Sequence, residues 1–150
     1  MYDTVLFPTD GSETATEAAI HAIDLAERHD AAIHVLYVVD HERVGRMAPK
    51  LGTDHIKETL QQEGERATAE IADRAAAAGL ETTTSIREGA PADVITDYAE
   101  AVGADAIVMG TNGRTGMDRL LLGSVAERVI QTTDLPVTTV KAPSDEAVDS

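Results

Sequence analysis

Residues 106–126 read AIVMGTNGRTGMDRLLLGSVA and pass from a short apolar run, through a glycine-rich segment, into a helical pattern. The apolar run is typical of a strand that is buried on both faces of a parallel sheet. Glycines after such a strand let backbone N–H groups converge on an anion, and the next helix adds the positive end of its dipole. The stretch therefore predicts a strand, a loop and a helix, with a binding place for phosphate at the loop.

The rest of the chain repeats this alternation of strand and helix. Runs rich in valine, isoleucine and threonine occur at residues 4–7, 32–39, 82–86 and 137–140, and helical patterns at 13–28, 56–78, 91–102 and 124–132. Such alternation is typical of βαβ units, so we expect an α/β fold with five strands in a mainly parallel sheet. Residues 40–52 lack helical periodicity and include Pro49, which predicts a mobile loop.

Composition restricts the partners of this chain. Its 150 residues include 27 acidic and 12 basic side chains, for a formal net charge of -15. This charge repels nucleic acids and anionic lipid surfaces, so we expect neither as a partner. There is no cysteine, which excludes a disulfide framework and a thiol nucleophile. No signal peptide or long apolar span is evident, which predicts a cytoplasmic location without a membrane anchor.

The distribution of charge suggests a salt-loving source. The acidic residues are spread along predicted helix faces, and only Lys50, Lys57 and Lys141 are lysines. Ordinary acidic solubility is the alternative explanation. In molar salt the Debye length shrinks to about 3 Å, so the net charge does not argue against an anionic ligand.

Ligands of open parallel sheets bind beyond the carboxyl ends of the strands, where the strand order reverses. Thr9 and Asp10 stand at one such end and Gly110 at another. Simpler interpretations remain open at this point, because glycines also mark turns, and Ser124 with Glu127 has the spacing of a helix capping box.

Three other phosphate-handling folds do not fit the sequence. The first strand-helix turn has no GxGxxG, which excludes a Rossmann dinucleotide site, and there is no GxxxxGK[ST] of a Walker P-loop. A phosphoreceiver domain needs an aspartate after the third strand, where this chain has Ile86, Arg87 and Glu88.

The glycine spacing resembles a known family. Gly110, Gly113 and Gly123-Ser124 reproduce the G-x2-G-x9-G-[ST] pattern of the ATP-binding branch of universal stress proteins. The resemblance extends to residues 5–12, 37–40 and 89–91, and it covers residues 1–142 as one domain, followed by an acidic tail at 143–150. With the acid excess, it suggests a member from a halophilic archaeon.

The resemblance implies an open five-stranded parallel sheet flanked by helices on both faces, in the adenine-nucleotide alpha-hydrolase-like, Rossmann-like three-layer sandwich. It also implies a homodimer formed partly through strand five, and a site for ATP or a related adenine nucleotide with Mg²⁺. The residues that match the family's nucleotide site are Pro8, Thr9, Asp10, Val38, Met109, Gly110, Gly113, Gly123, Ser124 and Val125.

Several of these residues have a second interpretation. Asp10 matches an acid near the ribose or metal, but it could equally cap the first helix. Val38 and Met109 match residues against the adenine, but they could be plain core. Arg114 could donate to a phosphate or stay in solvent. Asn112 departs from the family, where many relatives have histidine.

The resemblance leaves three functional hypotheses. The first is a nucleotide-sensing stress-response regulator that acts on an unknown protein partner. The second is a slow ATPase or autophosphorylating enzyme, and the third is a dimeric scaffold. The first is favoured because Asp10 is the only clear candidate for metal-assisted phosphoryl transfer, so we assign no catalytic residue. The five histidines lack ligand spacing, and the metal ligands stay unknown.

Overall fold

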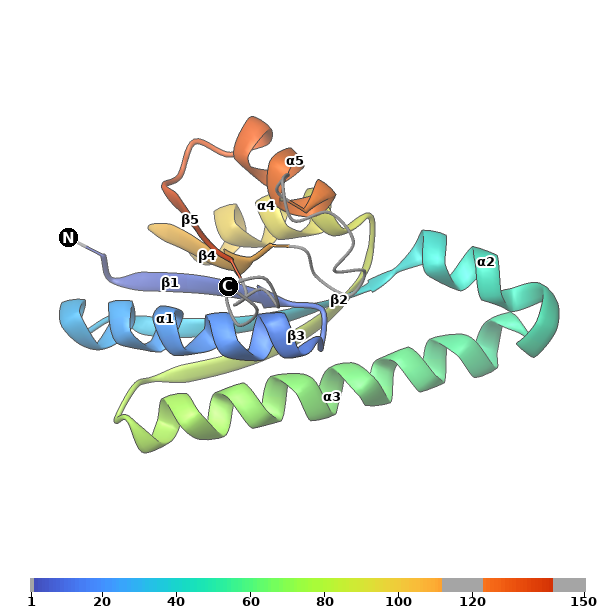
Figure 1. Ribbon diagram of the computed structural model, residues 1–150, viewed down its shortest axis with the longest axis horizontal. Helices are drawn as coiled ribbons and strands as arrows, with labels where there is room; N and C mark the ends of the chain where they lie inside the picture. Colours follow the sequence, from blue (N-terminus) through green and yellow to red (C-terminus); the bar gives the residue numbers. More distant parts are fainter. Residues whose placement is uncertain (1, 112–122, 142–150) are drawn as a thin grey trace, which may run out of the picture.

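The computed structural model describes residues 2–111 and 123–141 (Figure 1). Within these residues the chain alternates strands and helices, and α2 and α3 are the only two helices that follow each other directly. The elements are β1 (Thr4–Thr9), α1 (Glu13–His29), β2 (Ala32–Asp40), α2 (His41–Leu51), α3 (Thr53–Ala77), β3 (Thr82–Gly89), α4 (Pro91–Val102), β4 (Ala106–Gly110), α5 (Ser124–Thr132) and β5 (Val137–Val140).

The strands form a parallel sheet in the order β3-β2-β1-β4-β5. The chain moves outward from β1 to β3 and then returns to place β4 beside β1, where Val5 pairs with Ala106. The strand order therefore reverses between β1 and β4. In sheets of this kind, the crevice at that point is where ligands bind.

Two layers of helices cover the sheet, α1 and α3 on one face and α4 and α5 on the other (Figure 1). Successive strand residues point to opposite faces. Val5 and Phe7 accordingly pack with α1 and α3, while Leu6 packs with α4 and α5. The prediction of an α/β fold with a five-stranded parallel sheet and helices on both faces is confirmed.

The expected loop at residues 40–52 is wrong, because residues 41–51 form helix α2. Asp40 caps this helix by accepting a hydrogen bond from the Glu42 N–H at 2.9 Å. The helix buries only Val44, which packs with Ile56 and Leu60 of α3 against the end of β2. Because a single residue of α2 is buried, the sequence of this helix shows no apolar periodicity.

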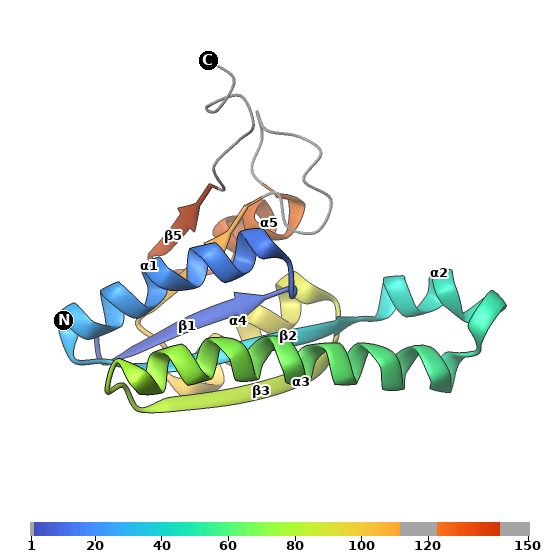
Figure 2. The ribbon, with the colours of Figure 1, turned by 60° about the horizontal axis from the view of Figure 1, so that its bottom comes forward.

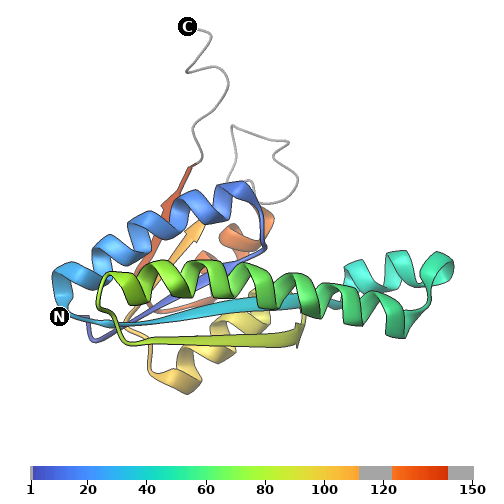
Figure 3. The same ribbon diagram turned by 90° about the horizontal axis from the view of Figure 1, so that it is seen from below.

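Helix α2 and the start of α3 extend beyond the end of the sheet (Figure 1), and we call residues 41–55 the arm. Figures 2 and 3 show the arm reaching past the strands at the same end as the β2–α2 junction. The turn between its helices is at Gly52, whose φ is +87°.

The other elements agree closely with the predicted ranges. Strand β3 continues to Gly89 instead of ending at residue 86, because its ladder with β2 persists until Asp40 pairs with Gly89. Helix α4 begins at Pro91 and is closed by Gly103 in the left-handed conformation, as the sequence predicts. In the part of the chain that the structure describes, no helix has the length and apolar character needed to cross a membrane.

Candidate functional site

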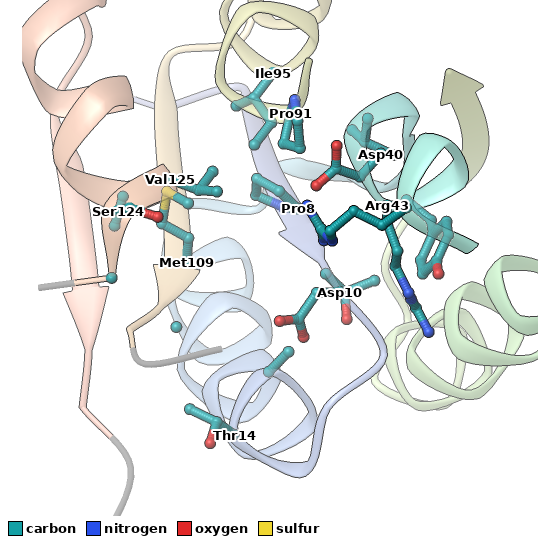
Figure 4. A pocket seen from close by; sticks show the side chains of 18 residues that line it. Pro8, Asp10, Thr14, Asp40, Arg43, Pro91, Ile95, Met109, Ser124 and Val125 are labelled. Atoms are coloured by element: carbon teal, nitrogen blue, oxygen red, sulfur yellow. The ribbon is translucent and has the colours of Figure 1, made fainter. Parts of the chain in front are cut away.

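A cavity of about 360 Å³ lies beyond the carboxyl ends of β1 and β4, where the strand order reverses (Figure 4). Its walls come from both sides of the sheet. Among the residues that line it are all the predicted site residues that the structure describes: Pro8, Thr9, Asp10, Val38, Met109, Gly110, Gly123, Ser124 and Val125. Gly113 and Arg114, the other two predicted residues, lie outside the described ranges.

The segment after β1 forms a tight turn that holds Asp10 at the cavity. The Thr9 hydroxyl accepts a hydrogen bond from the Gly11 N–H at 3.1 Å, and Asp10 accepts one from the Ser12 N–H at 2.9 Å. The N-cap of α1 is Ser12, whose hydroxyl accepts from the Ala15 N–H. The alternative interpretation of Asp10 as the cap of the first helix is therefore wrong.

The opposite wall is formed by the start of α5. The N-cap of this helix is Gly123, and no side chain caps it within the described residues. The capping-box interpretation of Ser124 is wrong, since Ser124 is already the first residue of the helix. A helix N-terminus without a side-chain cap presents backbone N–H groups and the positive end of the helix dipole to the cavity.

Apolar side chains line the part of the cavity between these walls. Figure 4 shows Pro8 of β1 beside Pro91 and Ile95 of α4, with Met109 and Val125 toward α5. Met109 is buried with 5% of its surface exposed, and Val38 is partly buried against the same core cluster. Both residues therefore belong to the core and to the lining of the cavity.

Helix α2 supplies lining residues that the sequence did not predict. Arg43 and Arg46 of α2 line the cavity, as does Tyr37 of β2. Arg43 forms an ion pair with Glu63 of α3 at 3.4 Å, and the Tyr37 hydroxyl donates a hydrogen bond to the same carboxylate. A signal for α2 was present in the sequence, because Asp40, Glu42 and Lys50 occupy the positions that helix starts and ends prefer.

The described residues hold few metal-ligand candidates. Asp10 and Asp40 are the two carboxylates among the lining residues, and Asp40 also caps α2. Within the described ranges, no group of three or more histidine, aspartate or glutamate side chains is placed to hold a metal ion. These described residues alone do not complete the coordination of a divalent cation, which takes six or more oxygen ligands.

Comparisons with known proteins agree with this geometry. The sequence profile of the universal stress protein family matches residues 1–141. The universal stress protein MJ0531 of Methanocaldococcus jannaschii is 42% identical over 146 residues, which cover 97% of this chain and 86% of that protein.

Two solved structures extend the likeness to three dimensions. The structure of MJ0577 from the same archaeon matches with a TM-score of 0.84 at 31% identity, covering 96% of this chain and 99% of that one. A universal stress protein in complex with cAMP matches with a TM-score of 0.71 at 26% identity, covering 95% and 98%. The fold is that of Rossmann-like adenine-nucleotide alpha-hydrolases.

Proposed function

Because this chain belongs to the universal stress protein family, we propose that it binds ATP or a related adenine nucleotide in the cavity at β1, β4 and α5. Nucleotide occupancy then regulates a stress response through a homodimer and a protein partner. The cavity volume of about 360 Å³ falls within the range of about 300–1,000 Å³ that is usual for small-molecule sites.

One observation carries this proposal. The residues that match the family's nucleotide site are spread from position 8 to position 125, yet those that the structure describes line a single cavity at the topological switch point. A glycine pattern that only marked turns would have no reason to meet Pro8, Asp10 and Val38 there. The neighbour in complex with cAMP supports an adenine nucleotide as the ligand class.

The chemistry of the walls supports one orientation of the nucleotide in this proposal. The phosphates lie at Gly110, Gly123 and Ser124, because backbone N–H groups and the α5 dipole favour anions. The motif residues Gly113 and Arg114 would complete this phosphate cradle. The adenine lies on the apolar lining between β1, β2 and α4, and Asp10 contacts the ribose or a metal. Such a site would hold Mg²⁺ mainly through phosphates and water.

Calorimetric titration with ATP and Mg²⁺ tests the site directly. The double variant Gly123→Val, Ser124→Ala places a side chain at the α5 N-terminus and removes the hydroxyl. Gly123 has an extended backbone, φ −60° and ψ 146°, which valine also adopts. We expect ATP binding at least about tenfold weaker, or ~1.4 kcal/mol.

The matched control is Thr132→Ala, which removes a hydroxyl at the other end of the same helix, where it bonds to the Arg128 carbonyl. This control should bind like the unaltered protein. Absence of ATP binding by the folded, unaltered protein would overturn the proposed site. Repeating the titration in EDTA should weaken ATP binding and leave AMP binding nearly unchanged if Mg²⁺ is held by the phosphates.

Sensing is distinguished from catalysis and from a scaffold by two further measurements. Rapid ATP turnover that is abolished by Asp10→Ala would favour the enzyme over the regulator. Sedimentation and partner capture with and without ATP should differ if occupancy controls assembly. If the protein is a dimer whose mass and captured partners are the same with and without ATP, the scaffold hypothesis is favoured.

A further inference from the structure

Arg46 is the second arginine of the cavity wall. It lines the cavity from α2, but among the described residues it forms no hydrogen bond or ion pair. Arg43, one turn earlier, is engaged by Glu63 at 3.4 Å. A ligand that contacts Arg46 therefore has no ion pair among these residues to break.

The position of α2 decides which part of a nucleotide Arg46 would meet. Figure 4 shows Asp40, which ends β2, and Arg43 of α2 on the side of the cavity opposite Ser124 and Val125 of α5, with Pro8 between them. The phosphate-binding features belong to the α5 side. The α2 side instead adjoins the apolar lining of Pro8 and Pro91.

We propose that the guanidinium of Arg46 stacks on the base of the bound nucleotide and covers it from the α2 side, which makes Arg46 a residue for base recognition. This inference rests on the proposed nucleotide site and adds a contact that the glycine motif does not contain. The base would then lie between an apolar lining and a planar cation. A guanidinium suits this role because it is planar, permanently charged and weakly hydrated.

The Arg43–Glu63 pair supports the geometry required for stacking. Glu63 joins α3 to Arg43 of α2 and to Tyr37 of β2. These contacts fix the N-terminal turn of α2 relative to the sheet. The backbone of Arg46 is therefore held at a defined position beside the cavity. Its side chain stays exposed and is available to a ligand.

Substitutions at Arg46 separate stacking on the base from a charge contact to phosphate. We would titrate AMP and ATP into the unaltered protein, Arg46→Ala and Arg46→Lys. Lys50→Ala is the matched control, because it removes the same charge from the same helix at a residue that does not line the cavity. Circular dichroism would verify that each variant is folded.

Stacking predicts that Arg46→Ala weakens the binding of AMP and of ATP by the same factor, about fivefold for a planar stacking contact worth ~1 kcal/mol. Arg46→Lys should weaken binding of both nucleotides nearly as much, because lysine keeps the positive charge but lacks the planar guanidinium. Lys50→Ala should bind both nucleotides normally.

Other results overturn the inference in distinguishable ways. A loss that is larger for ATP than for AMP and is restored by lysine would mean a phosphate contact. Unchanged binding by Arg46→Ala would mean a surface arginine without a role at the site. If the unaltered protein binds neither nucleotide, the proposed function fails together with this inference.

Discussion

At the scale of single residues, Gly64 shows how closely α3 approaches the sheet. A Cβ built at this position would lie 2.6 Å from the ring of Tyr37, which is only 1% exposed. We expect Gly64→Ala to lower the free energy of unfolding by about 1–3 kcal/mol through overpacking, although alanine favours helices.

The matched substitution is Gly45→Ala in α2, where nothing lies within 4 Å of the added carbon. It should raise stability by up to about 1 kcal/mol, since only helix propensity changes. Urea unfolding of both variants measures the contrast. Equal effects of the two substitutions would show that the Tyr37 contact does not constrain α3.

His34 makes stability depend on pH. Its Nδ1 lies 2.8 Å from the Tyr98 hydroxyl, which is also 2.9 Å from Ser85 Oγ. Burial lowers the pKa of His34 below its ordinary value of 6.5, and the charge of Glu81 only partly opposes this effect. Arg87 faces the same cluster, with its guanidinium 5.4 Å from the centre of the Tyr98 ring.

A lowered pKa means that the unfolded chain binds the proton first as the pH falls. The contribution of neutral His34 is therefore fully present above pH 6.5 and is lost as the pH falls through the folded-state pKa. The loss amounts to about 1.4 kcal/mol for each pH unit over which only the unfolded chain is protonated. Urea unfolding between about pH 5.5 and 7.5 measures it.

His34→Gln is the comparison, because it keeps a polar side chain without titrating. Its stability should change less with pH than that of the unaltered protein, while the other histidines contribute equally to both. Parallel pH profiles would contradict the role given to His34.

Some residues of the site could be predicted from the sequence and others could not. Asp10 follows β1 and Gly110 ends β4, and the carboxyl ends of parallel strands meet at one edge, so their proximity was predictable. Arg43 and Arg46 were not, because their place depends on α2, whose packing against α3 and β2 leaves little trace in the sequence.

At the scale of secondary-structure elements, α2 combines a small buried surface with a side-chain cap at its N-terminus. One residue of this helix, Val44, is buried, and Pro49 lies inside the last turn. Removal of the Asp40 carboxylate by Asp40→Ala should cost the helix about 1 kcal/mol, because the Glu42 N–H loses its acceptor.

Hydrogen exchange read by mass spectrometry measures this prediction on peptides from residues 41–52. Exchange there should accelerate in Asp40→Ala and stay slow in Asp40→Asn, since asparagine also caps helices. Unchanged exchange in the alanine variant would mean that contacts with α3 hold α2 without its cap.

At the scale of the whole molecule, net charge governs stability in salt. A formal charge of -15 on 150 residues produces self-repulsion that opposes the folded state. Raising KCl from about 0.1 to 1 M shortens the Debye length from about 10 to 3 Å. We expect the thermal midpoint to rise, by about 2–4 °C for each kcal/mol gained.

A scan with sucrose in place of salt is the control, because a neutral solute does not screen charge. Thermal midpoints that rise equally in KCl and in sucrose, or that do not change with KCl, would contradict a charge-based explanation. The same experiment tests the salt-loving character that the composition predicts. Composition alone predicts this dependence of stability on salt, because the self-repulsion depends on the sum of charges rather than on their placement.

The turn at Gly52 offers a use for the arm in protein engineering. Gly52 ends α2 and precedes α3, and nothing lies within 4 Å of a side-chain carbon built there. Extra chain is best tolerated at exposed turns of this kind. A fluorescent domain inserted at Gly52 would leave the sheet intact and sit at the far end of the helix that carries Arg46. The arm would then serve as the attachment point for an optical label at a distance from the hydrophobic core.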